Sequence, residues 1–352
     1  MKAINTGLAA FGMSGQVFHA PFISTNPHFN LSKIVERSKE LSKARYPDAT
    51  IVRSFNELIA DPNLELIVVN TPDSTHFEYA RMALEAGKNL VVEKPFTSTL
   101  KQAEELIALA KEKGLMITVY QNRRWDSDYQ TLREILDKGL LGRVVEFESI
   151  FARYRNYIKP DTWKETGELG GGLVYNLGSH LIDQALLQFG MPEAVYADID
   201  TLRSGGKVDD YFLIHFIRPE FDSKLKITLK ASYLMREPEP RFTVHGTSGS
   251  FVKYGVDKQE AALLAGEMPN QPHWGEENPT DWGLLHTEIN NEVIHQKYPS
   301  HQGTYASFYE NIYNHLRSNT PLYVDEKSIL NVIKVIEACN ESQRKGMVIQ
   351  LK

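Results

Sequence analysis

The first residues whose types and spacing suggest chemistry form a glycine-rich turn near the start of the chain. An apolar stretch at 3–10 runs into Ala10-Phe11-Gly12-Met13-Ser14-Gly15. This turn matches the dinucleotide fingerprint G-x-G-x-x-G, with alanine at the first glycine. The second glycine allows a pyrophosphate to approach the backbone, and the third allows the following helix to pack against the strand. We therefore expect phosphate binding by Gly12, Met13, Ser14 and Gly15; an ordinary strand–turn–helix is the alternative.

A mixed acidic and basic run follows the second apolar stretch, at 31–36. Glu36 ends that stretch, and Arg37-Ser38-Lys39 comes next. An acid about 20 residues beyond the glycines usually binds the ribose hydroxyls of NAD. Arginine, serine and lysine together favour a 2′-phosphate instead. The run predicts NADP as the preferred cofactor, with NAD as the alternative, unless the run is only a solvated turn.

Two further polar turns follow apolar stretches that read as strands. Glu93-Lys94-Pro95 ends the stretch at 89–94, and Thr71-Pro72-Asp73-Ser74-Thr75-His76 follows the stretch at 65–70. The carboxyl ends of parallel strands meet at one edge of a sheet, where open α/β sheets bind ligands. Taken alone, Lys94 reads as a lysine that extends into solvent from a strand end. His76 stands at the start of a helix, so it fits a helix-capping role as well as a ligand-binding role.

The elements that must position these turns alternate between strand and helix up to residue 121. Apolar strands at 3–10, 31–36, 50–55, 65–70, 89–94 and 115–120 are separated by helical stretches such as 76–88 and 99–114. In the helix at 99–114, apolar residues recur at i, i+3, i+4 and i+7, with Thr99 as N-cap and Gly114 at its end. This alternation predicts an N-terminal Rossmann domain, a doubly wound parallel sheet with helices on both faces.

The pattern changes after residue 121. Long strands at 144–154, 194–203, 210–217, 225–234, 241–246 and 292–298 alternate apolar and polar residues, and helices are expected at 127–138, 173–189, 304–318 and 328–345. Alternation is typical of an antiparallel sheet with two unlike faces. We therefore expect an α/β protein with a Rossmann domain at 1–121. The α+β domain at 122–352 would contain a large, mostly antiparallel open sheet and would serve substrate binding and oligomerisation, with closing helices that can pack back on the first domain.

Composition excludes several classes of protein. The 352 residues are 42% hydrophobic and 24% charged, and the net charge is −6 from 39 basic and 45 acidic residues. These fractions exclude a disordered chain and make nucleic acid a poor partner. No apolar run is long enough to span a membrane. The one cysteine, Cys339, reads as a small buried hydrophobe and fits a reducing, cytoplasmic location. No histidine pair has metal-ligand spacing, so no metal is expected.

Several of these motifs together resemble the Gfo/Idh/MocA oxidoreductase family (glucose–fructose oxidoreductase and inositol dehydrogenase). The E-K-P tripeptide is one, and Gly170-Gly171-Gly172 before YNLGSHLID at 175–183 is another. GMSGQVFHAPF, QNRRWD and HGTSGSFVKYG are most similar to the NADP-linked scyllo-inositol dehydrogenase branch. The resemblance implies a two-domain oxidoreductase of sugars or cyclitols. It also implies that the substrate lies between the domains, and that the C-terminal sheet builds a homodimer or homotetramer. The cofactor-binding residues that it adds are Thr71, Pro72, His76, Glu93, Lys94 and Pro95.

The resemblance also assigns the catalytic group. The family uses the E-K-P lysine, an aspartate, and a histidine four residues after that aspartate. Lys94 and His180 match, but Asn176 stands at the aspartate position. A histidine is suited to take a hydroxyl proton near neutral pH, whereas asparagine hydrogen-bonds but never ionises. This departure leaves open a slower enzyme, a shifted substrate, or a cofactor-binding protein without turnover, such as a sensor or assembly subunit.

Substrate binding is expected from polar and aromatic residues around the domain junction and the second domain. These are Arg124, Arg153, Trp163, Asn176 and Asp183. For at least one of Arg123 and Arg124 an interdomain ion pair is preferred, and Asp183 either orients His180 or forms a salt bridge. The predicted function is hydride transfer between a nicotinamide and a secondary alcohol or ketone of a cyclitol or sugar. A reductase of a non-sugar carbonyl or imine is a further alternative.

Overall fold

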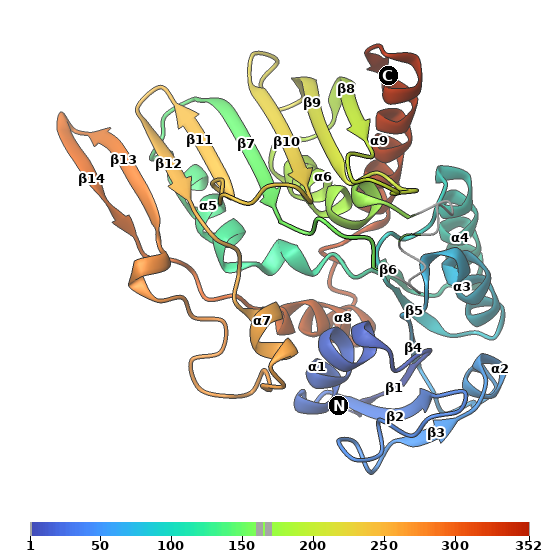
Figure 1. The fold of residues 1–352 in the computed structure, drawn as a ribbon. Helices are drawn as coiled ribbons and strands as arrows, with labels where there is room; N and C mark the ends of the chain where they lie inside the picture. The colour runs from blue at the N-terminus through green and yellow to red at the C-terminus, as the bar shows by residue number, and fades with distance from the viewer. Residues whose placement is uncertain (1, 160–164, 166–170, 352) are drawn as a thin grey trace. The chain divides into compact units, whose positions relative to one another are not determined.

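The computed structural model describes residues 2–159, 165 and 171–351, and the chain divides into two compact units (Figure 1). The first unit comprises Met1–Asn122, Lys258–Trp274 and Thr304–Leu330. The second comprises Arg123–Asp257, Gly275–Gly303 and Asn331–Lys352. The chain therefore leaves the first unit at Asn122 and returns to it twice.

A six-stranded sheet forms the centre of the first unit. Its strands are β1 (Ile4–Leu8), β2 (Phe29–Val35), β3 (Thr50–Val52), β4 (Leu66–Val69), β5 (Asn89–Val92) and β6 (Ile117–Val119). They pair in parallel in the order β3-β2-β1-β4-β5-β6. This is the strand order of dinucleotide-binding doubly wound sheets, and it confirms the predicted Rossmann domain.

Helices cover both faces of this sheet, as the strands apolar on both faces require. The helical elements of the unit are η1 (Gly15–His19), α1 (Ala20–Thr25), α2 (Phe55–Ile59), η2 (Asp73–Thr75), α3 (His76–Glu85), α4 (Leu100–Lys113), α7 (Gln259–Leu264) and α8 (Ala306–Ser318). Figure 1 shows α1 with α8 on one side and α2, α3 and α4 on the other. The Thr99 hydroxyl caps α4, and Gly114 ends it in the left-handed region, both as predicted.

The second unit contains a nine-stranded sheet that is antiparallel except where β7 pairs with β10. The order is β14-β13-β12-β11-β7-β10-β9-β8-β15. The bounds are β7 (Val144–Ala152), β8 (Pro192–Asp200), β9 (Tyr211–Pro219), β10 (Lys226–Ser232), β11 (Phe242–Gly246), β12 (Gly249–Lys253), β13 (Gly283–Ile289), β14 (Glu292–Tyr298) and β15 (Ile349–Gln350). The expected large, mostly antiparallel sheet is confirmed. The sequence reading missed β12, β13 and β15, whose strand character depends on their neighbours.

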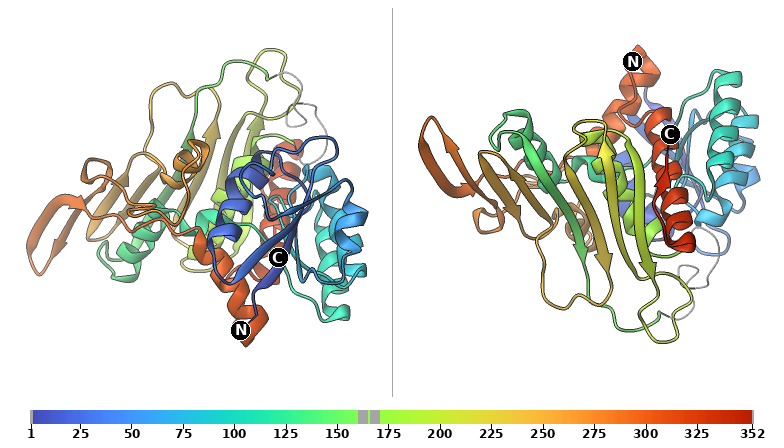
Figure 2. Two further views of the ribbon diagram at one scale, coloured as in Figure 1. Left: turned by 90° about the horizontal axis from the view of Figure 1, so that it is seen from below. Right: turned by 90° about the horizontal axis from the view of Figure 1, so that it is seen from above.

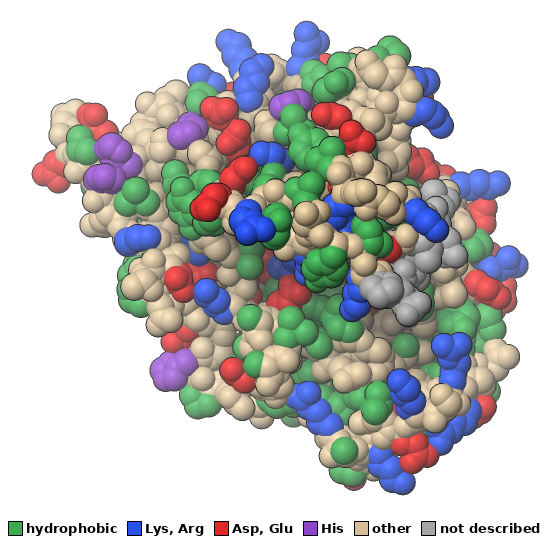
Figure 3. Space-filling view, viewed as in Figure 1, with side chains coloured by type: hydrophobic (Ala, Val, Ile, Leu, Met, Phe, Trp, Pro, Cys, Tyr) green, Lys and Arg blue, Asp and Glu red, His purple; other side chains and the backbone are tan. Residues whose placement is uncertain are grey.

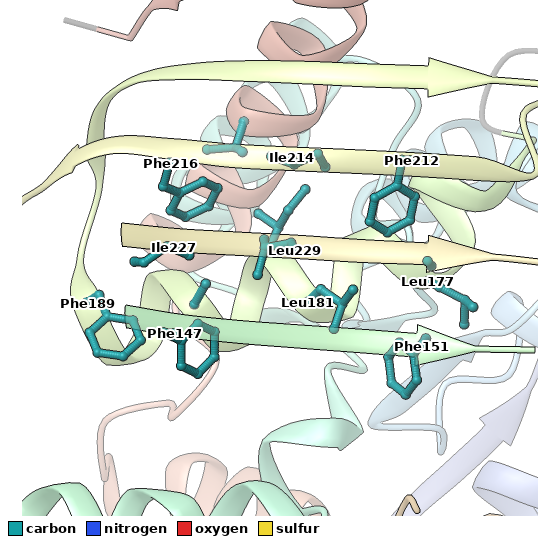
Figure 4. Packing of buried hydrophobic residues seen from close by; sticks show 14 of the residues in the cluster. Phe147, Phe151, Leu177, Leu181, Phe189, Phe212, Ile214, Phe216, Ile227 and Leu229 are labelled. Atoms are coloured by element: carbon teal, nitrogen blue, oxygen red, sulfur yellow. The ribbon is translucent and has the colours of Figure 1, made fainter. Parts of the chain in front are cut away.

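Helices pack on one face of this sheet and build the core there (Figure 2). The helical elements in the described part of the unit are η3 (Asn122–Trp125, which begins on the last residue of the first unit), α5 (Ser127–Asp137), η5 (Val174–Gly178), α6 (Ser179–Phe189), η6 (Pro279–Asp281) and α9 (Glu326–Lys345, whose first turn belongs to the first unit). Figure 4 shows Leu177 of η5 and Leu181 of α6 facing the aromatic side chains of β7 and β9. Cys339 lies in the same core, where burial raises its pKa well above its usual range.

One buried arginine ties the sheet to two helices. The Arg241 guanidinium lies 4.1 Å from the ring centroids of both Phe151 and Phe242. It donates to the Gln184 side chain of α6 at 2.6 Å, and its Nε lies 3.4 Å from the Asp128 carboxylate of α5. Since a buried cation is costly without such partners, these contacts fix α5 and α6 against the strands.

Acidic and basic side chains are interspersed on the face of the molecule drawn in Figure 3. Within the described part of the chain, no helix has the length and apolar character needed to cross a membrane.

Candidate functional site

The glycine turn lies where a dinucleotide-binding loop belongs, between β1 and η1. A side-chain carbon at Gly15 would lie 2.4 Å from the Ala10 carbonyl oxygen and 2.9 Å from Asn70 Nδ2, so only glycine allows this close packing. A carbon at Gly12 would meet no protein atom within 4 Å. The protein's own packing therefore explains Gly15 but not Gly12. The space at Gly12, beside the N-terminal N–H groups of a helix, fits the pyrophosphate of a dinucleotide.

Asn70 braces this turn from the end of β4. Its side-chain oxygen accepts from the Ala10 N–H at 3.0 Å, and its amide nitrogen donates to the Ala10 carbonyl at 2.8 Å. The two bonds hold the turn before it enters the helix. Sequence reasoning did not identify Asn70, although it identified the Thr71-Pro72 turn that follows directly.

The Glu36 carboxylate closes the loop that follows β2. It accepts from the backbone N–H groups of Leu41 at 2.8 Å and Ser42 at 2.9 Å, and from the Ser42 hydroxyl at 2.5 Å. Burial acts to raise its pKa, but these donors and Arg53 lower it on balance, so the group stays ionised. Both oxygens are thus engaged inside the loop, while Arg37, Ser38 and Lys39 are exposed on it.

The E-K-P turn meets the glycine turn through Glu93. The Ser14 hydroxyl donates to Glu93 Oε1, and the Lys94 N–H donates to Oε2 at 3.1 Å. The Lys94–Pro95 peptide bond is cis. Burial acts to raise the pKa of Glu93, but the hydrogen bonds from His19 and Ser14 and the charge of Lys94 lower it to about 2. The structure therefore joins two of the predicted cofactor motifs through one ionised carboxylate.

His76 links the other two predicted cofactor segments. It is buried at the start of α3, with Nδ1 2.8 Å from the Pro95 carbonyl and Nε2 2.9 Å from the Thr71 carbonyl. The backbone around Thr71 and the E-K-P turn is therefore held together through this ring. Its two nitrogens face protein carbonyls, which makes His76 a brace between the turns.

In the second unit, Asn176 and His180 lie on the continuous helical segment formed by η5 and α6. The segment begins against Asp209, whose carboxylate accepts from the Val174 N–H at 2.8 Å. Gly172, at φ +92°, leaves room for this carboxylate, because a side-chain carbon there would lie 1.9 Å from Asp209 Oδ1. Burial, with a smaller contribution from Asp210, raises the pKa of Asp209 to about 6. All three glycines before the helix were noted in the sequence, but Asp209 was not.

Arg124 and Asp183 form a buried, two-pronged ion pair. Arg124 Nε donates to Asp183 Oδ2 at 2.8 Å, and Nη2 donates to Oδ1 at 2.7 Å. Their side chains are 1% and 3% exposed. The pair lies within the second unit, and Arg123 pairs there with Asp126 at 3.1 Å. Because Asp183 follows His180 by one helical turn, its contact with Arg124 fixes the segment that carries His180.

The remaining predicted substrate residues are less closely grouped. Arg153 is half-buried just after β7, and its N–H donates to the Ser232 carbonyl at 3.1 Å. Trp163 lies outside the described residues. Asn176 Nδ2 lies 3.4 Å from the hydroxyl of Tyr233, whose ring faces the guanidiniums of Arg155 and Arg203 at 5.4 and 4.9 Å. The structure thus brings Tyr233 to Asn176, a contact that the sequence did not indicate. Among the described residues, no group of three or more metal-ligating side chains forms a cluster.

The raised pKa of Asp209 predicts a stability that depends on pH. The Asp209 carboxyl holds its proton more tightly in the folded protein than in the unfolded chain. As pH rises from about 4 to about 6, ionisation of Asp209 therefore destabilises the fold increasingly. Asp209→Asn keeps an acceptor for Val174 and removes the charge. We expect it to raise the free energy of unfolding by roughly 1–3 kcal/mol at pH 8, with the gain fading below pH 5. Urea denaturation across this range measures it, with exposed Asp198→Asn as control; a gain that is constant with pH contradicts the assignment.

The buried Arg124–Asp183 pair predicts strong asymmetry between single and double substitutions. Asp183→Leu leaves a buried guanidinium unpaired and should cost about 3–5 kcal/mol of unfolding free energy. Arg124→Met combined with Asp183→Leu should recover much of that loss. Exposed Arg143, 3.4 Å from Asp222, is the matched control, and Arg143→Met should cost under about 1 kcal/mol. Chemical denaturation that gives equal losses for Asp183→Leu and Arg143→Met would overturn this prediction.

Comparison with known proteins gives the family. The model described as "Oxidoreductase family, NAD-binding Rossmann fold" (GFO_IDH_MocA) matches residues 4–121, and "Oxidoreductase family, C-terminal alpha/beta domain" matches residues 133–351. The chain is 36% identical over 352 residues to scyllo-inositol 2-dehydrogenase (NADP(+)) IolW of Bacillus subtilis strain 168, covering 100% of this chain and 97% of the relative. It is 39% identical to the uncharacterised oxidoreductase YdgJ of Escherichia coli K12, covering 97% of this chain and 96% of the relative.

Solved structures similar to this chain are also oxidoreductases by their descriptions. A crystal structure of a Bacteroides fragilis NCTC 9343 protein classed as an oxidoreductase matches with TM-score 0.93 and 68% identity, covering 99% of this chain and 100% of that chain. The structure of YvaA from Bacillus subtilis, also classed as an oxidoreductase, matches with TM-score 0.95 and 36% identity, covering 100% and 99%. The family model matches most of the chain in two segments, and full-length relatives exceed 30% identity. The chain therefore belongs to the Gfo/Idh/MocA oxidoreductase family with an NAD-binding Rossmann fold, as the sequence motifs predicted.

Proposed function

We propose that this protein is an NADP-dependent dehydrogenase of a cyclitol or sugar, transferring hydride between the nicotinamide and a secondary alcohol or its ketone. One observation carries the proposal. The chain aligns over its full length with a scyllo-inositol 2-dehydrogenase that uses NADP(+). The resemblance in sequence, which matches Lys94 and His180 to the family's catalytic lysine and histidine, supports the same proposal.

The preference for NADP rests on the loop after β2. The acid that would bind ribose hydroxyls in an NAD enzyme is Glu36, and its two oxygens already accept three hydrogen bonds from Leu41 and Ser42. Arg53 further holds the loop by donating to the Glu36 and Lys39 carbonyls at 3.0 and 2.8 Å. The loop thereby presents Arg37, Ser38 and Lys39 as exposed donors for a phosphate.

The residues of the first unit that would hold the cofactor are those of its polar turns. Gly12, Met13, Ser14 and Gly15 would bind the pyrophosphate, and Arg37, Ser38 and Lys39 the 2′-phosphate. Thr71, Pro72 and the E-K-P turn would line the rest of the site, with His76 bracing them. When bound, the nicotinamide accepts or supplies the hydride.

His180 is the proposed proton acceptor. As the alcohol becomes a ketone, the carbon-bound hydrogen leaves with its electron pair, and the hydroxyl proton goes to the His180 imidazole. A Lys94 ammonium stabilises negative charge on the reacting oxygen. Asn176 orients the substrate by hydrogen bonds, as an amide that both donates and accepts. Without a carboxylate at 176, we propose that proton transfer runs through the His180 imidazole alone. The Arg124–Asp183 pair, although predicted to bind substrate, has the contacts of a positioning pair for the His180 helix.

Asn176 also supports a second candidate, a protein that binds the dinucleotide without turnover. Its side chain lies against Tyr233 and provides no ionisable group at the family's aspartate position. If only Asn176→Asp shows turnover, the second candidate is favoured over the enzyme.

We further propose that the open face of the nine-stranded sheet joins copies of this chain into a dimer or tetramer. Tyr196, Leu213 and Ile217 lie on the face opposite the helical core, and Tyr196 is 38% exposed. Tyr196→Glu should shift the mass measured by light scattering toward the monomer, while Phe221→Glu, outside this face, should not. A mass unchanged by Tyr196→Glu, or a monomeric parent protein, argues against this interface.

The basic loop predicts a selective loss of NADPH affinity. Arg37→Ala should weaken NADPH binding by roughly 10- to 100-fold, since it removes a two-pronged contact to a charged phosphate, and should leave NADH binding unchanged. Exposed Lys43→Ala, in the same loop region, is the control. Calorimetric titration measures each dissociation constant, and tighter binding of NAD than of NADP by the parent protein contradicts the preference.

Removal of the proposed base predicts a loss of turnover without a loss of cofactor. His180→Ala should lower kcat by roughly 10²- to 10⁴-fold, the usual contribution of general acid–base catalysis, with the NADPH dissociation constant unchanged. His245→Ala, on the sheet, is the control. Inositols, aldoses and sugar lactones, each with NADP and NAD, provide the substrate screen. Full activity in His180→Ala would show that another group takes the proton.

A further inference from the structure

A fully buried histidine of the first unit connects the E-K-P turn to α8. His19 Nε2 lies 2.9 Å from Glu93 Oε1, and Nδ1 lies 2.7 Å from the Tyr309 hydroxyl. An ionised carboxylate only accepts hydrogen bonds, so Nε2 carries a proton. In the neutral imidazole Nδ1 then accepts from the Tyr309 O–H. The result is a directed chain, from the Tyr309 hydroxyl through the His19 imidazole to the Glu93 carboxylate.

The surrounding rings hold this chain in one conformation. The His19 ring centroid lies 4.5 Å from that of Tyr120, and the Tyr309 ring meets Phe29 edge-on at 5.5 Å. His19 and Tyr309 are both 0% exposed. Neither side chain has room to change rotamer without disturbing a packed core.

This series of hydrogen bonds, from Tyr309 through His19 to Glu93, ends at residues beside the proposed cofactor site. Glu93 Oε1 also accepts from the Ser14 hydroxyl in the glycine turn, and Oε2 accepts from the Lys94 N–H. One carboxylate therefore sets the position of both turns. An apolar core at this place would avoid the cost of burying an ionised group. The polar chain thus needs a reason beyond stability.

We propose that His19, held by Tyr309, is a positioning residue for dinucleotide binding, acting through Glu93 on Ser14 and on the backbone of Lys94. The proposal rests on the dinucleotide site proposed above and assigns roles to two residues, His19 and Tyr309, to which the sequence motifs gave no role. His19 acts on the pyrophosphate and nicotinamide end of the site. The loop at Arg37–Lys39 is closed separately by Glu36 and Arg53, so we expect 2′-phosphate binding to be independent of His19.

The test compares two probes on the full-length protein. NADPH binding is measured by nicotinamide fluorescence, and binding of adenosine 2′-monophosphate, which has no pyrophosphate, by NMR titration. His19→Leu removes both hydrogen bonds, and Tyr309→Phe removes one while it keeps the ring. His19→Gln retains an N–H donor toward Glu93. Tyr313→Phe, on the same helix α8, is the matched control. Melting temperature is recorded without ligand.

We expect His19→Leu to weaken NADPH binding on the order of tenfold or more, as for the loss of a hydrogen bond to a charged group. Tyr309→Phe should weaken it less, His19→Gln should recover most of the affinity, and the nucleoside monophosphate should bind all variants equally. If His19→Leu does not fold, Tyr309→Phe decides. Unchanged NADPH affinity in a folded variant, or equal weakening of both probes, overturns the proposal. A parent protein that binds neither NADPH nor NADH overturns the proposed function itself.

Discussion

A parallel sheet must be covered on both faces, and the first unit of this protein is organised by that constraint. β4, β5 and β6 are buried almost throughout. Polar residues next to these strands in the sequence therefore lie beyond the strand ends, where they are not covered by helices. Because all six strands run in one direction, their carboxyl ends meet at one edge. The glycine turn, the loop after Glu36, the Thr71 turn and the E-K-P turn are gathered there without any need for proximity in sequence.

Ionised carboxylates then fix the turns at that edge. Glu36 closes its own loop through three donors, and Glu93 joins Ser14 to the backbone of Lys94. Each is an acid whose pKa is lowered although burial opposes ionisation. A buried charge tolerates few alternative geometries, because losing a partner leaves it uncompensated. This makes the carboxylates effective at holding loops that have little apolar surface of their own.

In the second unit, the proposed functional residues are held in place by the packing of a helix. The segment with Asn176 and His180 starts on the Asp209 carboxylate, is pressed on the sheet by Leu177 and Leu181, and is locked by Arg124 through Asp183. Apolar packing sets the distance of this helical segment from the sheet. The ion pair sets the rotation of the segment about its own axis. A side chain that must meet a substrate atom needs both.

Much of this fold is readable in the amino-acid sequence. Periodicity and glycine spacing identified the Rossmann fold and the mostly antiparallel second sheet, because these depend on local patterns. The E-K-P tripeptide and the motif at 175–183 carried the resemblance to the family. The pairing of the buried polar groups, in contrast, is seen only in the folded protein. Glu36 reads in sequence as a ribose-binding acid but is occupied within its loop. His19 and Tyr309 are 290 positions apart in the chain, yet they hydrogen-bond directly, and the other His19 nitrogen meets Glu93. Arg124 and Asp183 read as substrate ligands but satisfy each other. Partners of buried charges are chosen by proximity in the folded core, and no spacing along the chain encodes that proximity.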